Sequence, residues 1–154
     1  MQEISVILEQ FLEEMRDSGR EILDLEKTFA LLIDDYLVKG VIDRIDSDGN
    51  DFVLIDYKTS REIYGPKKAT EDIQLVLYSL AIQNLYGKRP KLVGWWFLRQ
   101  NKKIMVQISH EDIEMTIKKI NKIVESIRNA DFHPEPGWIC KNCDYRLVCN
   151  EAKY

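Results

Sequence analysis

At 154 residues, 45% hydrophobic and 31% charged, the chain has the size and composition of one globular domain with its own core. Its formal net charge of −4 at pH 7 argues against a protein that coats nucleic acid non-specifically, but it does not exclude a nuclease with local phosphate contacts. No apolar run approaches the ~20 residues of a transmembrane helix and no signal-peptide pattern is present, so we expect a cytoplasmic protein without membrane contact.

The first half of the chain predicts one helix followed by three strands. Apolar residues recur at helical spacing from Ile4 to Met15, with glutamates opposite them, which predicts an amphipathic helix ending near Gly19. Strands are predicted over 22–33, 36–45 and 52–58. The segment 46–50 is rich in hairpin residues and would lay the last two strands antiparallel, so the three strands predict a meander.

The second half predicts helices alternating with a hairpin. Residues 59–69 are expected to form a loop, and Thr70 suits the N-cap of a helix over 71–86 that stops at Gly87. A strand over 91–98 and its partner over 104–108 turn at 100–102, and Ser109-x-x-Asp112 opens a final helix to about Asn129 as a capping box. This order of elements predicts an α+β fold, with a sheet flanked by helices.

Two of the predicted strands carry acidic residues in apolar surroundings. Side chains i and i+2 of a strand share a face, so Asp56 and Lys58 point the same way, and the hairpin brings Asp43 near Asp56. A buried unpaired carboxylate is costly and two neighbouring carboxylates repel, unless a cation or a shared proton compensates them. Hard oxygen ligands at an open site favour Mg²⁺ or Mn²⁺. The alternative is a structural ion pair of Asp43 with Arg44 or Lys58.

Gln74 and Tyr78 lie four residues apart on the helix predicted over 71–86 and therefore share a face. A pair at this spacing usually lies at the edge of the core or in solvent. Because the helix follows the strand with Asp56 and Lys58, we favour contacts with the site or with substrate.

Two further features suit contact with nucleic acid. Trp95 and Trp96 are of the type that stacks on bases, but successive strand residues face opposite ways, so at least one is expected in the core. Short basic clusters are either local phosphate contacts or solvated loop charges, and they occur at Lys67-Lys68, Lys88-Arg89-Pro90-Lys91 and Lys102-Lys103.

All three cysteines lie within ten residues, as Cys140-x2-Cys143-x5-Cys149. A disulfide is the alternative, but cysteines this close in a cytosolic chain more often bind metal. With no fourth cysteine, a cluster would keep an open or non-cysteine site, zinc would take His133 or another chain as fourth ligand, or the tail would hold no metal. Because composition breaks at 131–137, we expect a core over 1–130 and a cysteine-rich tail over 131–154 packed on it.

These motifs resemble the RecB-like branch of the PD-(D/E)xK nuclease superfamily, which includes CRISPR-associated RecB-like exonucleases and the nuclease domains of AddAB helicase-nucleases. The resemblance covers most of the chain and rests on G-x-I-D-R-I-D at 40–46, I-D-Y-K-T-S at 55–60, the segment 72–78 and the cysteine tail. It implies a restriction-endonuclease-like mixed central sheet flanked by helices. It also implies metal-dependent hydrolysis of DNA, single-stranded or at ends, in repair, recombination or CRISPR-related processing.

Position by position, the resemblance implies that Asp43 and Asp56 are metal ligands and that the Tyr57 carbonyl adds a third oxygen. Lys58 would orient or help deprotonate the attacking water. Glu26 matches a glutamate often found before the family's G-x-x-D-R strand, and it either approaches the site or pairs with its neighbour Lys27 or solvent. A weaker candidate is a second glutamate, on the N-terminal helix, Glu14.

Gln74 and Tyr78 match the family's Q-x-x-x-Y helix, and the tail would supply three thiolates of a four-iron four-sulfur cluster. The N-terminal part departs from the family's pattern. The relatives usually begin with a helix carrying a His or Glu that completes the metal shell, whereas His110 and His133 both follow the strand over 52–58. The first cluster cysteine is also missing, so we expect that the family's N-terminal segment is lacking. The chain is then an exonuclease, with a helicase or other subunit supplying missing motifs, or a catalytically incomplete module that binds DNA or a partner protein.

Overall fold

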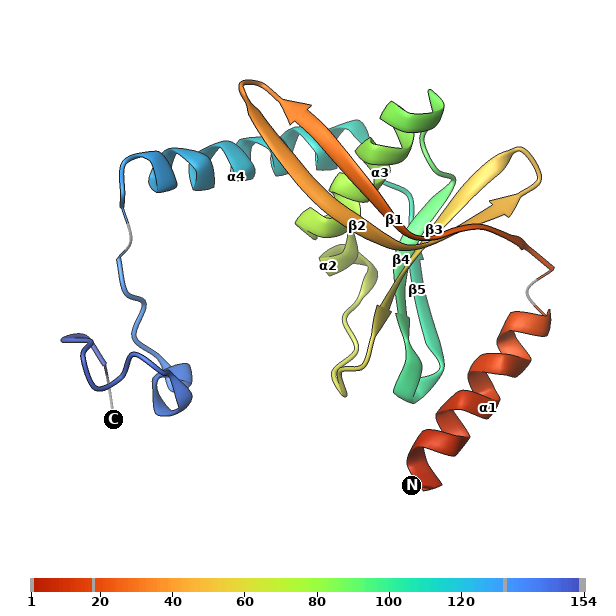
Figure 1. The fold of residues 1–154 in the computed structure, drawn as a ribbon, viewed down its shortest axis with the longest axis horizontal. Helices are drawn as coiled ribbons and strands as arrows, with labels where there is room; N and C mark the ends of the chain where they lie inside the picture. The colour runs from red at the N-terminus through yellow and green to blue at the C-terminus, as the bar shows by residue number, and fades with distance from the viewer. Residues whose placement is uncertain (1, 18, 132, 153–154) are drawn as a thin grey trace. The chain divides into compact units, whose positions relative to one another are not determined.

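The computed structural model describes residues 2–17, 19–131 and 133–152 (Figure 1). The chain divides into two compact units, residues 1–117 and 118–154. The elements, in chain order, are α1 (Gln2–Asp17), β1 (Glu21–Ile33), β2 (Tyr36–Asp48), β3 (Asp51–Lys58), α2 (Pro66–Thr70), α3 (Ile73–Tyr86), β4 (Leu92–Phe97), η1 (Leu98–Gln100), β5 (Lys102–Val106), α4 (His110–Arg128) and η2 (Trp138–Asn142).

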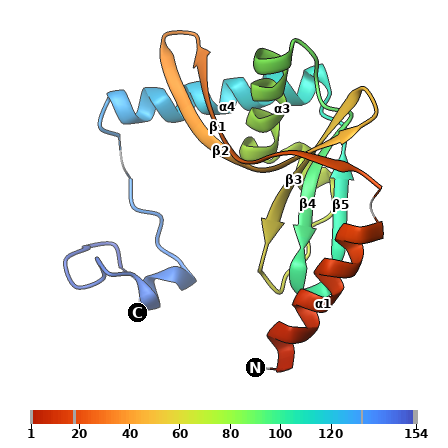
Figure 2. The ribbon, with the colours of Figure 1, turned by 45° about the vertical axis from the view of Figure 1, so that its right-hand side comes forward.

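Five strands form one sheet in the order β1-β2-β3-β4-β5, in which only β3 and β4 are parallel. The predicted α+β architecture with a mixed sheet is therefore confirmed, and so is the meander of β1, β2 and β3 (Figures 1 and 2). β2 runs three residues beyond the predicted end, to Asp48, so the hairpin closes on a two-residue turn. Gly49 in that turn has a φ of +67°, a conformation that glycine adopts at little cost.

The glycine of the G-x-I-D segment is required by packing. Gly40 pairs with Phe29 across β1 and β2, and a Cβ atom at this position would lie 2.6 Å from the Phe29 ring. The ring instead lies against the bare backbone and meets Tyr78 of α3 edge-on, with 6.0 Å between the ring centroids. The hairpin and α3 are thus joined through this aromatic contact.

The crossover between β3 and β4 differs from the prediction at its start. Thr70 is not the N-cap of α3; Asp72 is, and its side chain accepts a hydrogen bond from the Leu75 N–H at 3.0 Å. Residues 66–69, predicted as loop, form the short helix α2 together with Thr70, and Pro66 at its first position favours this helix. The Thr70 hydroxyl donates back to the Lys67 carbonyl at 3.0 Å and so belongs to α2.

The ends of the later elements also shift slightly. β4 ends at Phe97 and β5 spans Lys102–Val106, two residues earlier than predicted, because η1 and Asn101, with a φ of +45°, make the turn. The capping box of α4 is confirmed: the Ser109 and Asp112 side chains bond each other's backbone N–H groups at 3.1 and 2.8 Å. No helix within the described ranges is long and apolar enough to cross a bilayer.

Helices cover both faces of the central strands. On one face, α1 places Phe11 over Ile55 and Trp96, and the Phe11 and Trp96 rings stack at 5.0 Å. On the other face lies α3, whose side chains reach Asp56 of β3. Because both faces are covered, Trp95 and Trp96 are both buried, with 2% and 1% of their surface exposed. Their suggested role in base stacking is therefore wrong.

Candidate active site

Two carboxylates, Asp43 and Asp56, come together where β2 and β3 run side by side. The register that pairs Arg44 with Ile55 places Asp43 opposite Asp56 in the antiparallel ladder. Asp43 Oδ2 accepts a hydrogen bond from the Tyr57 backbone N–H at 3.0 Å. No ion pair of Asp43 occurs in the described ranges: Lys58 pairs with Asp56, and Arg44 pairs elsewhere, so the predicted structural pairs of Asp43 do not form.

Four side chains from β3 and α3 form a closed ring of polar contacts. Lys58 Nζ lies 2.5 Å from Asp56 Oδ2 and donates to Gln74 Oε1 at 3.2 Å. Gln74 Nε2 donates to the Tyr78 hydroxyl at 2.8 Å, and that hydroxyl donates to Asp56 Oδ1 at 3.5 Å. The structure thus joins Gln74 and Tyr78 to the Asp56–Lys58 pair, with Tyr78 buried and Gln74 still exposed to solvent.

The electrostatics of this ring follow from burial. Asp56 is 2% exposed, and this burial raises the pKa of its carboxyl group. The ion pair with Lys58 lowers that pKa, whereas the charges of Asp43 and Asp72 raise it. The resulting pKa lies above the ordinary aspartate value. Burial, together with the charges of Asp56 and Asp43, also raises the pKa of Tyr78. The phenol therefore stays protonated at neutral pH and acts as a hydrogen-bond donor.

Glu26 lies beside Asp43 in the register between β1 and β2 and carries a strained backbone. Its φ is +51°, a value that is uncommon for any residue but glycine and that recurs at functional sites. Its side chain is exposed, and the neighbouring Lys27 pairs with Asp24 at 2.6 Å. The predicted pairing of Glu26 with Lys27 is therefore not the arrangement observed.

Glu14, the weaker candidate, lies on α1. Its Oε2 atom is 2.5 Å from Lys103 Nζ on β5. Because α1 covers the face of the sheet opposite to Asp56, Glu14 does not join the acidic pair.

The sequence interpretation missed a buried ion pair directly behind the site. Arg44 Nε lies 2.5 Å from Asp46 Oδ1 and Nη2 donates to Oδ2 at 2.8 Å, with both residues 1% exposed. Arg44 Nη1 donates to the Tyr57 hydroxyl at 3.3 Å and contacts Met15 Sδ of α1. Burial opposes the charge of Arg44, but these hydrogen bonds leave its pKa raised. The alternation rule contained the signal, since Arg44 and Asp46 share a face that Asp43 does not.

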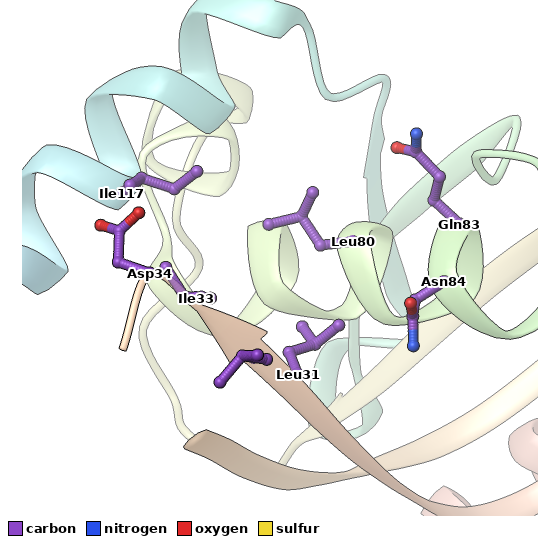
Figure 3. Close-up of a pocket in the computed structure, with 8 residues that line it drawn as sticks. Leu31, Ile33, Asp34, Leu80, Gln83, Asn84 and Ile117 are labelled. Atoms are coloured by element: carbon purple, nitrogen blue, oxygen red, sulfur yellow. The ribbon is translucent and has the colours of Figure 1, made fainter. Parts of the chain in front are cut away.

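A separate cavity of about 530 Å³ lies between β1, α3 and Ile117 (Figure 3). Apolar side chains such as Leu31 and Leu80 line it together with Gln83 and Asn84. Its lining residues include none of Asp43, Asp56, Lys58, Gln74 and Tyr78, so the acidic pair and this cavity are distinct features.

A family model for the PD-(D/E)XK nuclease superfamily matches residues 2–150, nearly the whole chain. The chain belongs to the PD-(D/E)XK nuclease superfamily. It is 27% identical over 133 residues to the Gene 69 protein of Mycobacterium phage D29, an alignment covering 81% of this chain and 47% of that protein. The chain thus spans about half the length of this relative.

The crystal structure of SSO0001 resembles this PD-(D/E)XK chain in fold. The two share 17% identity with a TM-score of 0.53, over 97% of this chain and 69% of that one. The restriction-endonuclease-like architecture, a mixed sheet flanked by helices, is confirmed by superfamily membership together with the five-stranded sheet. The nucleases that give this superfamily its name typically use a divalent metal.

The donor set at the acidic pair fits a divalent ion. Asp56 Oδ2 is buried and, apart from its ion pair with Lys58, has no hydrogen-bond partner within the described ranges. Mg²⁺ is usually held by one or two carboxylates and keeps several waters, which Asp43, Asp56 and the Tyr57 carbonyl allow. No group of three or more His, Cys, Asp or Glu side chains in the described part of the chain is arranged as a metal site, so water would supply the remaining ligands.

The three cysteines lie in the unit 118–154 and line one cavity of about 250 Å³. No disulfide joins them and all three are half-buried, so the alternative of a disulfide is not the observed arrangement. The Gly137 N–H donates to Cys140 Sγ at 3.3 Å, but the three sulfurs are not arranged as a metal cluster. His133 pairs with Asp131 at 2.8 Å and is not among the residues that line this cavity, so the predicted zinc ligation by His133 is not the observed arrangement.

Proposed function

We propose that this chain is a divalent-metal-dependent DNA nuclease, an exonuclease of the RecB-like branch that acts in repair, recombination or CRISPR-related processing. The observation that carries the proposal is the contact ring of Asp56, Lys58, Gln74 and Tyr78, with Asp43 beside it. It joins a carboxylate pair, an amine and two polar groups of a neighbouring helix, as metal-assisted hydrolysis requires.

In this proposal Asp43, Asp56 and the Tyr57 carbonyl would hold the ion, and water would complete its shell, because Glu26 on the next strand is exposed and forms no group of three with the two aspartates. The ion, when bound, polarises the phosphate and lowers the pKa of a bound water. Lys58 positions that water, while Gln74 keeps the lysine aimed at the site through the 3.2 Å hydrogen bond.

The ring also supports a role for Tyr78. As a protonated phenol it would orient the Asp56 carboxylate through Oδ1 and leave Oδ2 to Lys58 and, when it is bound, to the ion. Gln74 bridges Tyr78 and Lys58, so that both ends of the Asp56-x-Lys58 segment are held from α3.

A second candidate is a catalytically incomplete nuclease-fold module that binds DNA or a partner protein. The observation that favours it is the absence, within the described ranges, of a third acidic or histidine side chain converging on Asp43 and Asp56. In this case a helicase or another subunit would complete the site.

The two candidates are separated by digestion of end-labelled single- and double-stranded DNA in Mn²⁺. We expect the wild-type chain to cut and the Asp56→Ala and Lys58→Ala variants to lose at least a hundredfold in rate, with Glu114→Ala, an exposed acid of α4, as the matched control. Equal rates for wild type and both site variants would refute the nuclease assignment and leave the binding module.

For the tail, we propose that Cys140, Cys143 and Cys149 hold an iron-sulfur cluster or zinc. Their shared cavity and the N–H···S hydrogen bond to Cys140 support this. Iron and zinc analysis of anaerobically purified protein, with Cys143→Ser melted in parallel, tests it. A metal-free wild-type chain that melts at the same temperature as the variant would contradict it.

A further inference from the structure

The structure separates the three basic clusters of the sequence by what their side chains do. In the second cluster, Lys88 pairs with Asp51 and Lys91 pairs with Asp48 at 3.0 Å, so both close the turn between β2 and β3. In the third, Lys103 pairs with Glu14 and lies 4.2 Å from the Trp96 ring centroid, so it holds α1 on the sheet. These lysines have structural partners.

The first cluster, Lys67 and Lys68, is exposed on the segment that follows β3. The Lys67 side chain is 89% exposed, and its carboxylate neighbour Glu71 is 3.9 Å away, at the limit of an ion pair. Lys68 Nζ lies 3.4 Å above the centroid of the Tyr64 ring, which fixes the direction of the side chain without neutralising its charge. Both ammonium groups can therefore donate to an incoming anion.

This segment, residues 59–71, is anchored to the sheet beside the active site. Arg99 Nε donates to the Thr59 carbonyl at 2.8 Å, and Gln100 Nε2 donates to the Arg61 carbonyl at 2.7 Å. These bonds come from η1, directly after β4. The start of the segment is thus hydrogen-bonded to η1.

The middle of the segment connects the lysines to the acidic pair. The Tyr64 ring packs edge-on against Trp95, with 5.7 Å between centroids. Trp95 is the register partner of Asp56 across the parallel strands β3 and β4. The path from Lys68 through Tyr64 and Trp95 to Asp56 therefore consists of direct neighbours.

We propose that residues 59–71 form a phosphate-contacting surface for the DNA strand that enters the active site, with Lys67 and Lys68 contacting phosphates next to the one that is cut. Arg61, exposed on the same segment, adds a third cation, while Glu62 at the Tyr64 hydroxyl and Glu71 confine the positive surface to a short stretch. This inference rests on the proposed nuclease function. A chain of net charge −4 needs local cations where it contacts DNA, and this surface supplies them beside the active site.

The test measures binding of a fluorescein-labelled 20-nucleotide oligothymidylate by anisotropy from 50 to 300 mM NaCl, in an Asp56→Asn background that prevents cutting. Each phosphate contact on a single strand contributes about 0.7 to the slope of log K against log salt. Replacing Lys67 and Lys68 by Ala should therefore lower the slope by about 1.4 and raise Kd at 50 mM salt about 60-fold. The pair Lys118→Ala/Lys119→Ala removes the same charge from exposed positions of α4 and should change neither quantity.

Lys67→Arg/Lys68→Arg keeps the charges and should retain the slope, which separates a phosphate contact from a folding defect. An unchanged slope in the alanine pair, an equal loss in the α4 pair, or no salt-dependent binding at all would overturn the inference. If the wild-type chain cuts DNA but the slope stays constant, the surface fails and the nuclease assignment stands. If the slope falls but no cutting occurs in Mn²⁺, the nuclease assignment fails; Lys67 and Lys68 then contact phosphates, but the inference that these adjoin a phosphate that is cut is overturned.

Discussion

The buried pair of Arg44 and Asp46 predicts a large and specific loss of stability. Both side chains are 1% exposed and joined by two contacts at 2.5 and 2.8 Å, so Arg44→Met leaves the Asp46 carboxylate buried without its partner. Breaking a buried pair from one side costs about 3–5 kcal/mol. For a chain of this size, each kcal/mol lowers Tm by about 2–4 °C, so the variant should melt about 6–20 °C below wild type.

Urea unfolding followed by far-UV circular dichroism measures the change in the free energy of unfolding. Lys27→Met is the matched control: it breaks the solvent-exposed pair with Asp24, which should cost far less than breaking the buried pair. The double variant Arg44→Met/Asp46→Leu removes both charges and should recover most of the loss. A loss of stability in Arg44→Met no larger than that in Lys27→Met, or a double variant as unstable as Arg44→Met alone, would contradict this prediction.

Two further predictions concern the active site and the sheet. Because burial raises the pKa of Asp56, its ionised form destabilises the metal-free fold, so Asp56→Asn should raise Tm at neutral pH. As pH rises from the ordinary aspartate pKa to the raised pKa of Asp56, the free energy of unfolding of the wild type should fall relative to that of the variant, and at higher pH the difference should stay constant. A difference that does not change with pH anywhere in this range would contradict the prediction. A Cβ at Gly94 would meet the backbone of Ile104 and Met105, so Gly94→Ala should cost about 3 kcal/mol or more in urea unfolding. Gly65→Ala, with no atom within 4 Å and a φ of −83°, should change stability by less than about 0.5 kcal/mol, and equal losses would disprove the clash.

The strands and the position of the acidic pair could be predicted because they depend on local patterns. Alternation and turn residues place Asp43 and Asp56 on adjacent antiparallel strands, and the register then puts them opposite each other. The start of α3 could not be predicted as well, because Thr70 and Asp72 are both good caps. The choice between them depends on α2, where the hydroxyl of Thr70 is already bonded to the Lys67 carbonyl.

Contacts between distant segments lay outside the sequence reasoning. Arg44 meets Met15 across 29 positions, so a pattern limited to one strand cannot show that the arginine is buried under α1. The burial of both tryptophans has the same origin, since it needs a helix on each face of β4. The strained φ of Glu26 has no sequence signature either, because glutamate gives no sign of a left-handed backbone.

Because the ring of contacts joins β3 to α3, the site is complete only while α3 is packed on the sheet. Its two longer links join residues 16 and 22 positions apart, Lys58 to Gln74 and Tyr78 to Asp56, so neither segment carries the site alone. Proteins open locally at a lower free energy than they unfold. A local opening that separates α3 from the sheet breaks the contacts of both Lys58 and Asp56 with α3, while strands β1, β2 and β3 stay paired. The time that α3 spends docked therefore sets an upper limit on the fraction of molecules that hold a complete site.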